Sequence, residues 1–221
     1  MNLSEDGSNV TGNKHKIQCD CLSISGGWTP MVHMHTQSGG KLDFREIDQV
    51  FVPSEKSENH INVGSCNGDF ELEEIVKNTN NKVKKFLNIN ESGFDKISVL
   101  CSKELEKKNI WLLPNTISEG KTKSFIDFQN DSTAKDIKLA LREGFKSIEH
   151  VKRYTTTGMA TDQGKLSNMH ALGIIADTAG VKMGTLGTTT FRPPFTPLTF
   201  GAIVGRSVGK FFDVVRKTSI H

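Results

Sequence analysis

The chain has 221 residues, of which 35% are hydrophobic and 24% charged, and it carries 28 Lys and Arg against 25 Asp and Glu. This composition indicates one or two ordinary domains with enough apolar residues for a core, and the net charge of +3 is too small by itself to indicate nucleic acid or an anionic membrane as a partner. No apolar run approaches the roughly 18 residues of a membrane span, and the first residues lack the pattern of a signal peptide, so we expect a cytoplasmic protein.

The cysteines and the two ends of the sequence add two expectations. The cysteines, at positions 19, 21, 66 and 101, form neither a disulfide framework nor a CxxC metal pattern, so we expect free thiols. The apolar alternation begins at once near Ile17, and the apolar stretch at 211–215 runs on to His221 without a terminating signal. We therefore expect the chain to be a piece of a longer polypeptide.

The first third of the chain predicts strands, a glycine turn and a helix. Residues 17–25 alternate polar and apolar side chains and end at Gly26-Gly27, which is typical of a strand that enters a tight turn, and residues 30–35 form a second expected strand. After Phe51-Val52-Pro53, small residues and glycines at 61–68 lead directly into an amphipathic stretch with helical spacing. Its apolar positions are Leu72, Ile75, Val76, Val83, Phe86 and Leu87.

Residues 88–120 lose this periodicity, and we interpret them as a connecting segment with a solvated charged run at 103–108. The second half is predicted to be helical with loops. Thr133 followed by Asp136 resembles a capping box and predicts a short helix that stops at Gly144. Its inward positions are Ile137, Ala140 and Leu141.

Two further helices are predicted after residue 144. One begins at Ser147 and runs through Val151, and the other covers 165–179 and ends at Gly180. The inward side of the second helix is expected to consist of Met169, Leu172, Ile175, Ala176 and Ala179. Residues 184–194 are predicted to be non-helical, because their adjacent prolines remove amide donors and fix an extended backbone.

The glycine turn at 64–68 is a possible phosphate site. Exposed amides and the positive end of the helix dipole would face the same point there. A glycine turn before a helix is common, however, and without a GxGxxG pattern nearby a plain tight connection is the favoured interpretation of these residues alone.

Other local patterns leave two interpretations open. The Cys19/Cys21 and His33/His35 pairs each place two possible ligands on one face of a predicted strand, so a zinc site fits the spacing, but two-residue alternation already explains both pairs. The run at 149–157 contains bases, an aromatic ring and hydroxyls that could hold a phosphate of a cofactor or of RNA. Nucleic acid is disfavoured because no second aromatic platform or broad basic stripe is present, and a helix end whose bases pair with carboxylates also explains the run.

The residues alone identify no nucleophile with an assigned base and no pair of catalytic carboxylates. His150 and His170 are single histidines on predicted helices, where such residues are more often surface or structural groups than catalysts.

Longer strings carry a more specific signal. They are Ser25-Gly26-Gly27-Trp28-Thr29-Pro30, Phe128-Gln129-Asn130-Asp131, Glu143-Gly144-Phe145, residues 149–156, Gly158-Met159-Ala160-Thr161-Asp162-Gln163-Gly164-Lys165 and Thr188-Thr189-Thr190-Phe191-Arg192-Pro193-Pro194. Together, and in this order, they resemble the alpha subunit of heterotetrameric sarcosine oxidase, over about residues 17–221.

This resemblance implies a fold of the α/β (α+β) class. It consists of the C-terminal part of a disulfide-reductase-type dinucleotide-binding domain, followed by a small helical domain that resembles the [2Fe-2S] domain of bacterioferritin-associated ferredoxin without its cysteines. The implied divisions are a disordered or truncated leader at 1–16, the C-terminal part of the FAD/NAD(P)-binding domain at 17–90, a linker at 91–120, the small helical sarcosine oxidase alpha-type domain at 121–205, and the start of a truncated folate-binding domain of the glycine-cleavage T type at 206–221.

The positions that would hold an iron–sulfur cluster lack sulfur. Residues 126–129 align with the C-x-C segment and residues 162–167 with the C-x-G-x-x-C segment, which places Asp127, Gln129, Asp162 and Ser167 at the ligand positions. Because cluster irons need thiolate ligands and these side chains carry hard oxygen atoms, we expect no iron–sulfur cluster.

The family resemblance also implies an activity. The assembled enzyme would be an oxidoreductase acting on CH–NH donors, in which alpha works with beta, gamma and delta subunits to demethylate sarcosine oxidatively to glycine. The one-carbon unit would pass to tetrahydrofolate and the electrons to oxygen, giving hydrogen peroxide. FMN would lie at the interface of alpha and beta, FAD and tetrahydrofolate elsewhere in the complex. No nucleic acid or membrane is an implied partner, and the chain is expected to be inactive alone.

Some cofactor-binding residues follow from the same resemblance. Part of the NAD site of the alpha subunit would fall near Ser65, Phe70 and Leu72, largely through the backbone, and the turn with Gly64 and Gly68 agrees physically because amides at a helix start favour a pyrophosphate. The 188–194 segment would line the wall toward FMN and the beta subunit. Within it, Arg192 would be a phosphate partner, an expectation that rests on its residue type alone.

Two other functions stay open from the sequence. The first is an alpha-like subunit of a related amine dehydrogenase, such as N-methylglutamate dehydrogenase, whose acceptor is not oxygen. The second is a non-catalytic interaction module that uses the extended Phe191-Arg192-Pro193-Pro194 segment as a docking strip.

Overall fold

The computed structural model describes residues 2–4, 7–13, 15–54, 60–90, 109–114, 121–193, 196–211 and 217–220. The strands form three antiparallel pairs, β1 (Asn2–Leu3) with β2 (Val10–Thr11), β3 (Leu42–Arg45) with β4 (Val50–Pro53), and β5 (Phe125–Asp127) with β6 (Ser132–Thr133). The α-helices are α1 (His33–Gln37), α2 (Leu72–Leu87), α3 (Ala134–Arg142), α4 (Ile148–Thr155), α5 (Ser167–Ala179), α6 (Met183–Leu186) and α7 (Phe200–Val204). Short 3-10 helices span Gly64–Asn67 and Arg206–Phe211.

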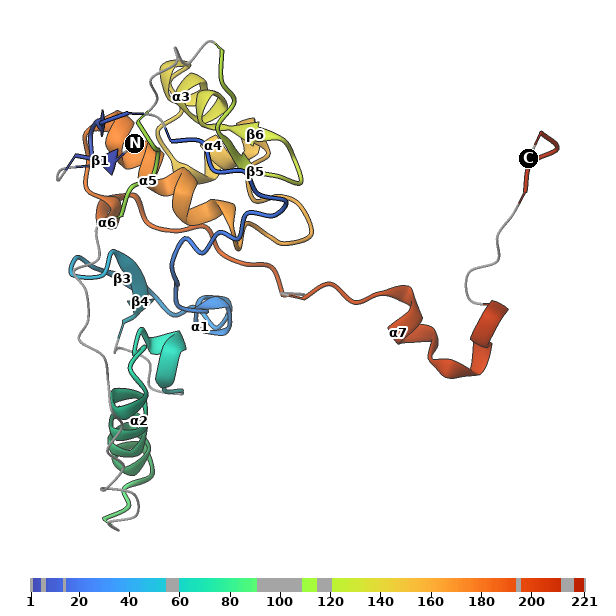
Figure 1. Ribbon diagram of the computed structural model, residues 1–221. Helices are drawn as coiled ribbons and strands as arrows, with labels where there is room; N and C mark the ends of the chain where they lie inside the picture. The colour runs from blue at the N-terminus through green and yellow to red at the C-terminus, as the bar shows by residue number, and fades with distance from the viewer. Residues whose placement is uncertain are drawn as a thin grey trace.

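The helices α3, α4 and α5 lie together in one unit (Figure 1) and supply most of a cluster of buried apolar side chains. The predicted capping box begins α3, where the Asp136 carboxylate accepts hydrogen bonds from the amide and the hydroxyl of Thr133 at 2.8 and 2.7 Å. This cap satisfies donors that the first helical turn leaves without intrahelical partners. Ile137 and Ala140 then point inward, and both are fully buried, as the spacing predicts. The core of this helical unit consists of Ile126, Ala134, Ile137, Ala140, Val151, Ala171, Ile174 and Ile175.

Helix α5 lies at the centre of the unit (Figure 1) and is buried on nearly all sides over residues 171–176. A side chain at Gly173 would place its Cβ 2.2 Å from the Trp111 ring, so the indole packs directly on the helix backbone at this glycine. Trp111 belongs to the predicted linker, yet it packs against the core. The predicted end at Gly180 is confirmed, since that residue adopts φ +64°, but Ala179 is exposed rather than inward because the helix emerges from the core before it ends.

The β3–β4 hairpin docks on the helical unit through a second cluster of buried side chains, Phe51, Leu172, Ala176 and Met183. The rings of Phe44 and Phe51 lie 4.9 Å apart between their centroids, and Phe44 also approaches Gly184 of α6. The hairpin therefore shares apolar contacts with α5 and α6, although these helices follow it at a long distance in the sequence.

Several predicted elements take a different form. Residues 30–35 are not a strand, because α1 covers His33–Gln37 and satisfies its amides locally, with the Thr36 amide donating to the Val32 carbonyl at 3.0 Å. Residues 17–25 form no strand either, and Ile17 and Ile24 are 83% and 82% exposed. A strand needs a neighbour for its ladder of hydrogen bonds, and this segment has none among the described residues.

The 184–194 segment is partly helical, contrary to expectation. Helix α6 covers Met183–Leu186, with Met183 buried and Gly187 at φ +71° ending the helix. The prolines that predicted an extended backbone lie well beyond this turn, so their restriction does not reach it. Cys101, the charged run at 103–108, Pro194 and the apolar residues 212–215 lie outside the described residues.

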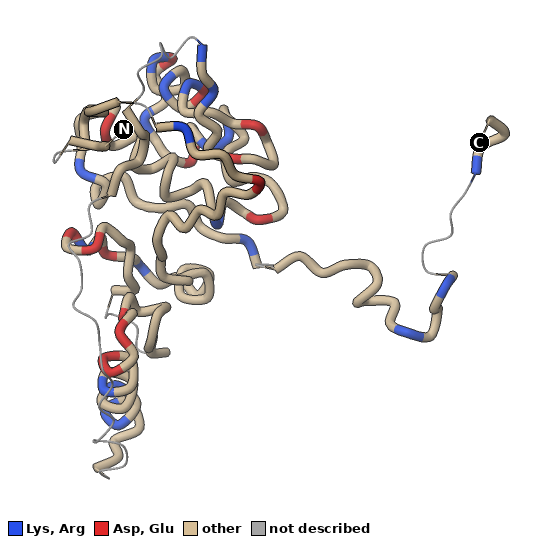
Figure 2. Tube along the Cα trace, viewed as in Figure 1, with Lys and Arg blue, Asp and Glu red and all other residues tan. Residues whose placement is uncertain are grey.

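Helix α2 and the C-terminal segment differ from the helical unit. The predicted helix is confirmed as Leu72–Leu87, but none of its residues is buried, and it extends beyond the hairpin at the lower end of the molecule (Figure 1). After residue 193 the chain leaves the compact part and carries α7 away from it (Figure 1). Acidic and basic residues are mixed along the trace of the compact part (Figure 2). None of the described helices combines the length and apolar character needed to cross a bilayer.

Candidate functional site

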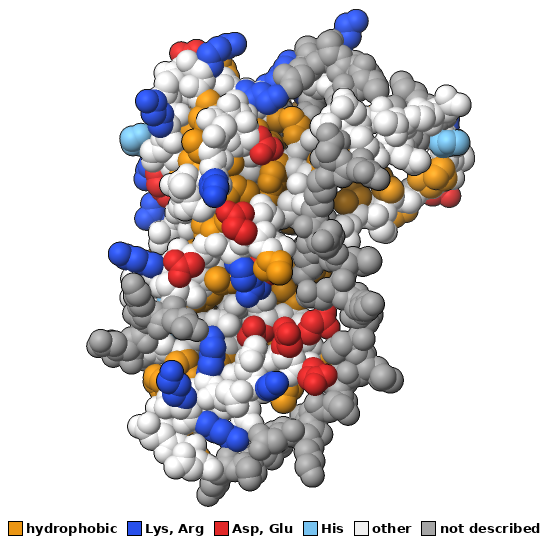
Figure 3. Space-filling view, turned by 90° about the vertical axis from the view of Figure 1, so that its left-hand side faces the viewer, with side chains coloured by type: hydrophobic (Ala, Val, Ile, Leu, Met, Phe, Trp, Pro, Cys, Tyr) orange, Lys and Arg blue, Asp and Glu red, His pale blue; other side chains and the backbone are white. Residues whose placement is uncertain are grey.

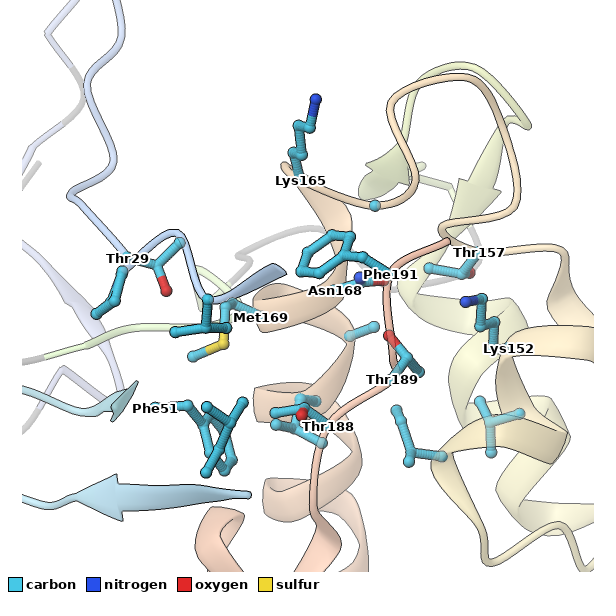
Figure 4. Close-up of a pocket in the computed structure, with 18 of the residues that line it drawn as sticks. Thr29, Phe51, Lys152, Thr157, Lys165, Asn168, Met169, Thr188, Thr189 and Phe191 are labelled. Carbon is cyan, nitrogen blue, oxygen red and sulfur yellow. The ribbon is translucent and has the colours of Figure 1, made fainter. Parts of the chain in front are cut away.

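A cavity of about 70 Å³ lies where five parts of the chain meet (Figure 4). Residues 29–32, the β3–β4 hairpin, the helices α3 to α5, the loop before α5 and residues 188–191 all contribute to its walls. Its floor is apolar and includes Phe51, Ile137, Val151, Met169 and Leu172. The cavity thus lies between the hairpin and the helical unit, where their apolar side chains meet.

Lys152, Thr157, Asn168 and Thr189 form a polar side of the cavity, whereas Thr29 lies at its opposite end (Figure 4). Lys152 of α4 turns its amine toward the neighbourhood of Thr157, whereas the Lys165 amine points away from the cavity (Figure 4). Burial lowers the pKa of the Lys152 amine; the nearby Glu149 acts in the opposite sense, and Arg192 and Arg153 lower it further.

Asn168 of α5 reaches this side of the cavity because two glycines make room for it. A Cβ at Gly158 would lie 2.4 Å from the Asn168 Oδ1 atom, and a Cβ at Gly164 would lie 2.1 Å from it. Any side chain larger than that of glycine would therefore collide with Asn168 at both positions. Both glycines also have positive φ angles, +70° and +76°, which other residues rarely adopt. The Asn168 side-chain amide donates to the Gln163 carbonyl at 3.2 Å, so the loop and the helix hold each other in place.

A buried carboxylate joins the two loops behind this wall. Asp127, which is 3% exposed, accepts hydrogen bonds from the amides of Gln129, Asn130 and Gly158 at 2.9, 3.0 and 2.7 Å. The Gln129 side-chain oxygen in turn accepts from the Asp162 amide at 3.3 Å. These charge-assisted and neutral bonds fix the 156–164 loop against the 127–131 loop.

The four positions aligned with cluster cysteines therefore have definite environments of their own. Asp127 and Gln129 bind backbone amides, and the Asp162 carboxylate accepts from the Gly164 amide at 3.1 Å. The Ser167 hydroxyl is buried and has no hydrogen-bond partner among the described residues. No group of three or more His, Cys, Asp or Glu side chains that could hold a metal ion occurs in the described part of the chain.

The backbone of Arg192 holds the 188–193 segment against two neighbours, the 156–164 loop and α1. The Arg192 amide donates to the Gln163 side-chain oxygen at 2.7 Å, and the Gln37 side chain donates to the Arg192 carbonyl at 2.6 Å. The Arg192 side chain is exposed, and its positive charge acts on Lys152. Arg192 thus belongs to the rim of the cavity.

The other predicted cofactor residues lie in a separate place, on the turn that leads into α2. Gly64 and Gly68 both have positive φ angles, Ser65 and Leu72 are exposed, and Phe70 is half-buried. The Gly68 amide donates to the Ser65 carbonyl at 3.1 Å, so one amide of the turn is already bound within it.

This turn is anchored to the hairpin by Arg45. The guanidinium donates to the Gly68 carbonyl at 2.6 Å and forms a bidentate ion pair with Asp48. A Cβ at Gly68 would lie 2.7 Å from Arg45 and from Val52, which explains the need for glycine here. The buried Asp69 carboxylate accepts from the Asn67 and Asn78 side chains at 3.3 and 3.2 Å, beside the start of α2.

The suggested zinc ligands are not brought together. Cys19 and Cys21 are exposed free thiols, and His35 is buried among other partners. The Nε2 atom of His35 lies 2.8 Å from the Lys41 carbonyl, to which it donates, so the Nδ1 atom is an acceptor in the neutral ring. This Nδ1 atom lies 2.8 Å from His60 Nε2.

Part of this site could be predicted from the sequence. The runs that contain Lys152 and Arg192 predict phosphate-binding groups, and in the structure the Arg192 charge acts on Lys152. No sequence pattern predicts the roles of Asn168 and Gln163, which depend on loop geometry. The two glycines at 158 and 164, flanking a polar loop, were the available signal for that geometry.

Comparisons with known proteins find similarity to sarcosine oxidase. Residues 121–206 match the Sarcosine oxidase A3 domain. Over 95% of its length the chain is 34% identical to the alpha subunit of sarcosine oxidase from Corynebacterium sp. (strain U-96) and 37% identical to that from Rhizobium meliloti (strain 1021). It spans about a fifth of the length of these relatives, 22% and 21% respectively.

A solved structure shows a similar fold. The crystal structure of L-proline dehydrogenase from P. horikoshii matches with a TM-score of 0.52 and 19% sequence identity, over 80% of this chain and 37% of the other. Along almost its whole length the chain is thus similar to the alpha subunits of sarcosine oxidase, and residues 121–206 match the A3 domain of sarcosine oxidase.

Proposed function

We propose that this chain is part of the alpha subunit of a multi-subunit oxidoreductase that oxidises the CH–NH bond of sarcosine, with oxygen as the electron acceptor. The observation that carries the proposal is the 34% and 37% identity to named sarcosine oxidase alpha subunits over 95% of the chain. In the complete complex, beta, gamma and delta subunits would be the partners, and the one-carbon unit would pass to tetrahydrofolate.

The contribution of this chain would be to hold cofactors and subunits rather than to carry out the chemistry alone. The rim at 188–193, held by Gln163 and Gln37, offers a rigid wall with one exposed arginine. A guanidinium in this position suits a phosphate, because it binds two oxygens at once. We assign this wall to the FMN side of the interface with beta; when bound, FMN would supply electron transfer. FAD would lie elsewhere in the complex.

The turn at 64–68 would be one wall of the NAD site, with Ser65, Phe70 and Leu72 beside the start of α2. It fits this role only in part, because the amide of Gly68 is bound inside the turn and the Asp69 carboxylate lies next to it. A second wall with its own phosphate-binding amides is needed for a complete site. Dinucleotide binding would therefore depend on residues beyond those at 64–72.

The helical unit would serve as a spacer with the form of a [2Fe-2S] domain but with no cluster. The Asp127 bonds to three backbone amides support this role, since they hold the two loops together without metal. This assignment predicts that the helical unit keeps its structure when metal chelators are added.

The experiment is reconstitution. The chain, within its full-length subunit, is produced with the beta, gamma and delta subunits, and sarcosine-dependent oxygen uptake and hydrogen peroxide formation are measured. We expect both with the complete set and neither with this chain alone. Oxidation of N-methylglutamate with an artificial acceptor, in place of oxygen uptake with sarcosine, would assign the chain to the amine dehydrogenases. Stable association with partners that contain no flavin would favour the interaction module.

A further inference from the structure

The cavity beside Lys152 has properties that cofactor binding at its rim does not use. Its floor is formed by side chains that are almost fully removed from solvent, with Phe51, Val151 and Leu172 at most 4% exposed. A volume of about 70 Å³ would hold on the order of five to seven water-sized groups. The space therefore suits a small molecule with about six non-hydrogen atoms, most of them apolar.

The single amine on the polar side of this space is not neutralised by the described residues. Lys152 forms no salt bridge in the described part of the chain, and the nearest acid that acts on it, Glu149, is itself paired with Arg153 at 3.0 Å. Arg192 adds a further positive charge from the rim. A positive charge at the edge of an apolar cavity favours an anion, because the ligand replaces the hydration that the amine has lost.

The groups around the amine also indicate which kind of anion. Thr189, which is 8% exposed, lines the cavity near Lys152 and has no hydrogen-bond partner among the described residues (Figure 4). The Lys152 amine and the Thr189 hydroxyl together match the two oxygens of a carboxylate. A phosphate dianion has further oxygens, and most of the lining that would face them is apolar.

From these observations we propose that the cavity binds a short aliphatic carboxylate, with its carboxylate at Lys152 and Thr189 and its hydrocarbon part on Phe51, Met169 and Leu172. This site goes beyond the proposed function and holds whether or not the chain assembles with flavin-containing partners. It is distinct from the turn at 64–68, which contributes no residue to the cavity.

The test is titration of the chain with butyrate, followed by calorimetry, with 1-butanol and inorganic phosphate as comparison ligands. We expect butyrate to bind with a dissociation constant on the order of millimolar, as suits a ligand of about six heavy atoms. We expect 1-butanol and phosphate to bind at least about tenfold more weakly, which corresponds to one missing charge-assisted contact. Equal binding of butyrate and 1-butanol, stronger binding of phosphate, or no heat with butyrate at tens of millimolar would each overturn the proposal.

Two variants and a control locate the contact. Lys152→Met keeps the length and apolar stem of the side chain and should weaken butyrate about tenfold or more, and Thr189→Val, which keeps the shape, should weaken it about threefold. Lys135→Met, which removes an exposed amine from α3, should leave the affinity unchanged. Thr189→Val provides an independent test if Lys152→Met does not fold, and unchanged butyrate binding in either variant contradicts the site.

The dependence on pH gives a readout that a merely structural lysine would not show. Butyrate binds the charged amine, so its affinity should fall as the pH rises through the lowered pKa of Lys152, with Glu149, Arg153 and Arg192 as the neighbouring charges. In Lys152→Met the affinity should not vary over that range. A pH profile that is identical in the two proteins would assign binding to another group.

Discussion

Helices α5 and α2 are the longest of the described part of the chain, and they differ completely in what surrounds them. Helix α5 has 13 residues, and the consecutive residues 171–176 are all buried. Helix α2 has 16 residues and an apolar side, but none of its residues is buried, and Leu72 and Leu87 are more than half exposed. Amphipathic spacing therefore indicates that a helix has a face to bury, but not that a partner is present among the neighbouring residues.

The surface agrees with this contrast. On the face seen in Figure 3, hydrophobic side chains are scattered among charged ones. Residues 17–31 and 198–211 contribute further exposed apolar side chains, among them Trp28, Leu198 and Phe200. The helical unit also exposes Phe128 and Leu166, but it has a core of its own, whereas residues 17–31 and 198–211 contribute to neither buried cluster.

The largest effect should come from removing a buried side chain of α5. Ile175→Ala should lower the free energy of unfolding by about 2–5 kcal/mol, because the side chain is fully buried and its removal leaves a cavity. Leu72→Ala in α2 is the matched comparison and should cost less than about 1 kcal/mol, since its side chain is 54% exposed. Urea unfolding followed by circular dichroism measures both. Equal losses would show that α2 packs as tightly as α5 in solution.

The next effect concerns the loop connection at Asp127. Asp127→Asn removes the negative charge that accepts three amides and should destabilise the helical unit by about 1.5–3 kcal/mol. Hydrogen exchange at Gly158 should become faster in the same variant. Asp131→Asn, an exposed neighbour in the same loop, is the control and should change neither quantity measurably. Unchanged exchange at Gly158 would mean that the carboxylate does not hold the two loops together.

A third effect tests the contact between Trp111 and α5. Gly173→Ala adds a methyl group where the indole ring packs and should cost about 1–3 kcal/mol through overpacking, although alanine favours helices elsewhere. Tryptophan fluorescence should shift to longer wavelength as the ring becomes more exposed. The control is Asp177→Ala at an exposed position of the same helix, which should leave the fluorescence unchanged. A stabilised Gly173→Ala protein would show that the ring packs elsewhere.

Local signals in the sequence predicted the helical unit well. The cap at Thr133 and Asp136, the inward positions Ile137 and Ala140, and the stop at Gly180 are each set by residues within one or two turns of the feature they define. Such interactions leave a readable spacing.

Contacts between distant parts of the chain, including those that build the candidate site, left no such spacing. Phe51 meets Leu172 from a distant part of the sequence, and Trp111 reaches Gly173 from a stretch without periodicity. The sequence from Met31 to His35 fits alternation and helix equally well over so few residues. The structure forms α1 there, and the buried His35 ring contacts His60 and the Lys41 carbonyl. The cavity wall therefore depends on long-range packing that no short window encodes.

The smallest effect returns to α2 and tests whether this helix is energetically separate. Its N-cap is Glu71, whose side chain makes no capping hydrogen bond, so amides of the first turn lack a side-chain cap. Glu71→Ser supplies a good cap and should stabilise α2 by about 0.5–1 kcal/mol. Because no residue of α2 is buried, we expect slower hydrogen exchange within 72–87 but the same urea midpoint for the helical unit. If the urea midpoint of the helical unit rose by the shift that corresponds to the full stabilisation from the cap, α2 would unfold together with α5. The contrast between the two helices would then not describe the protein in solution.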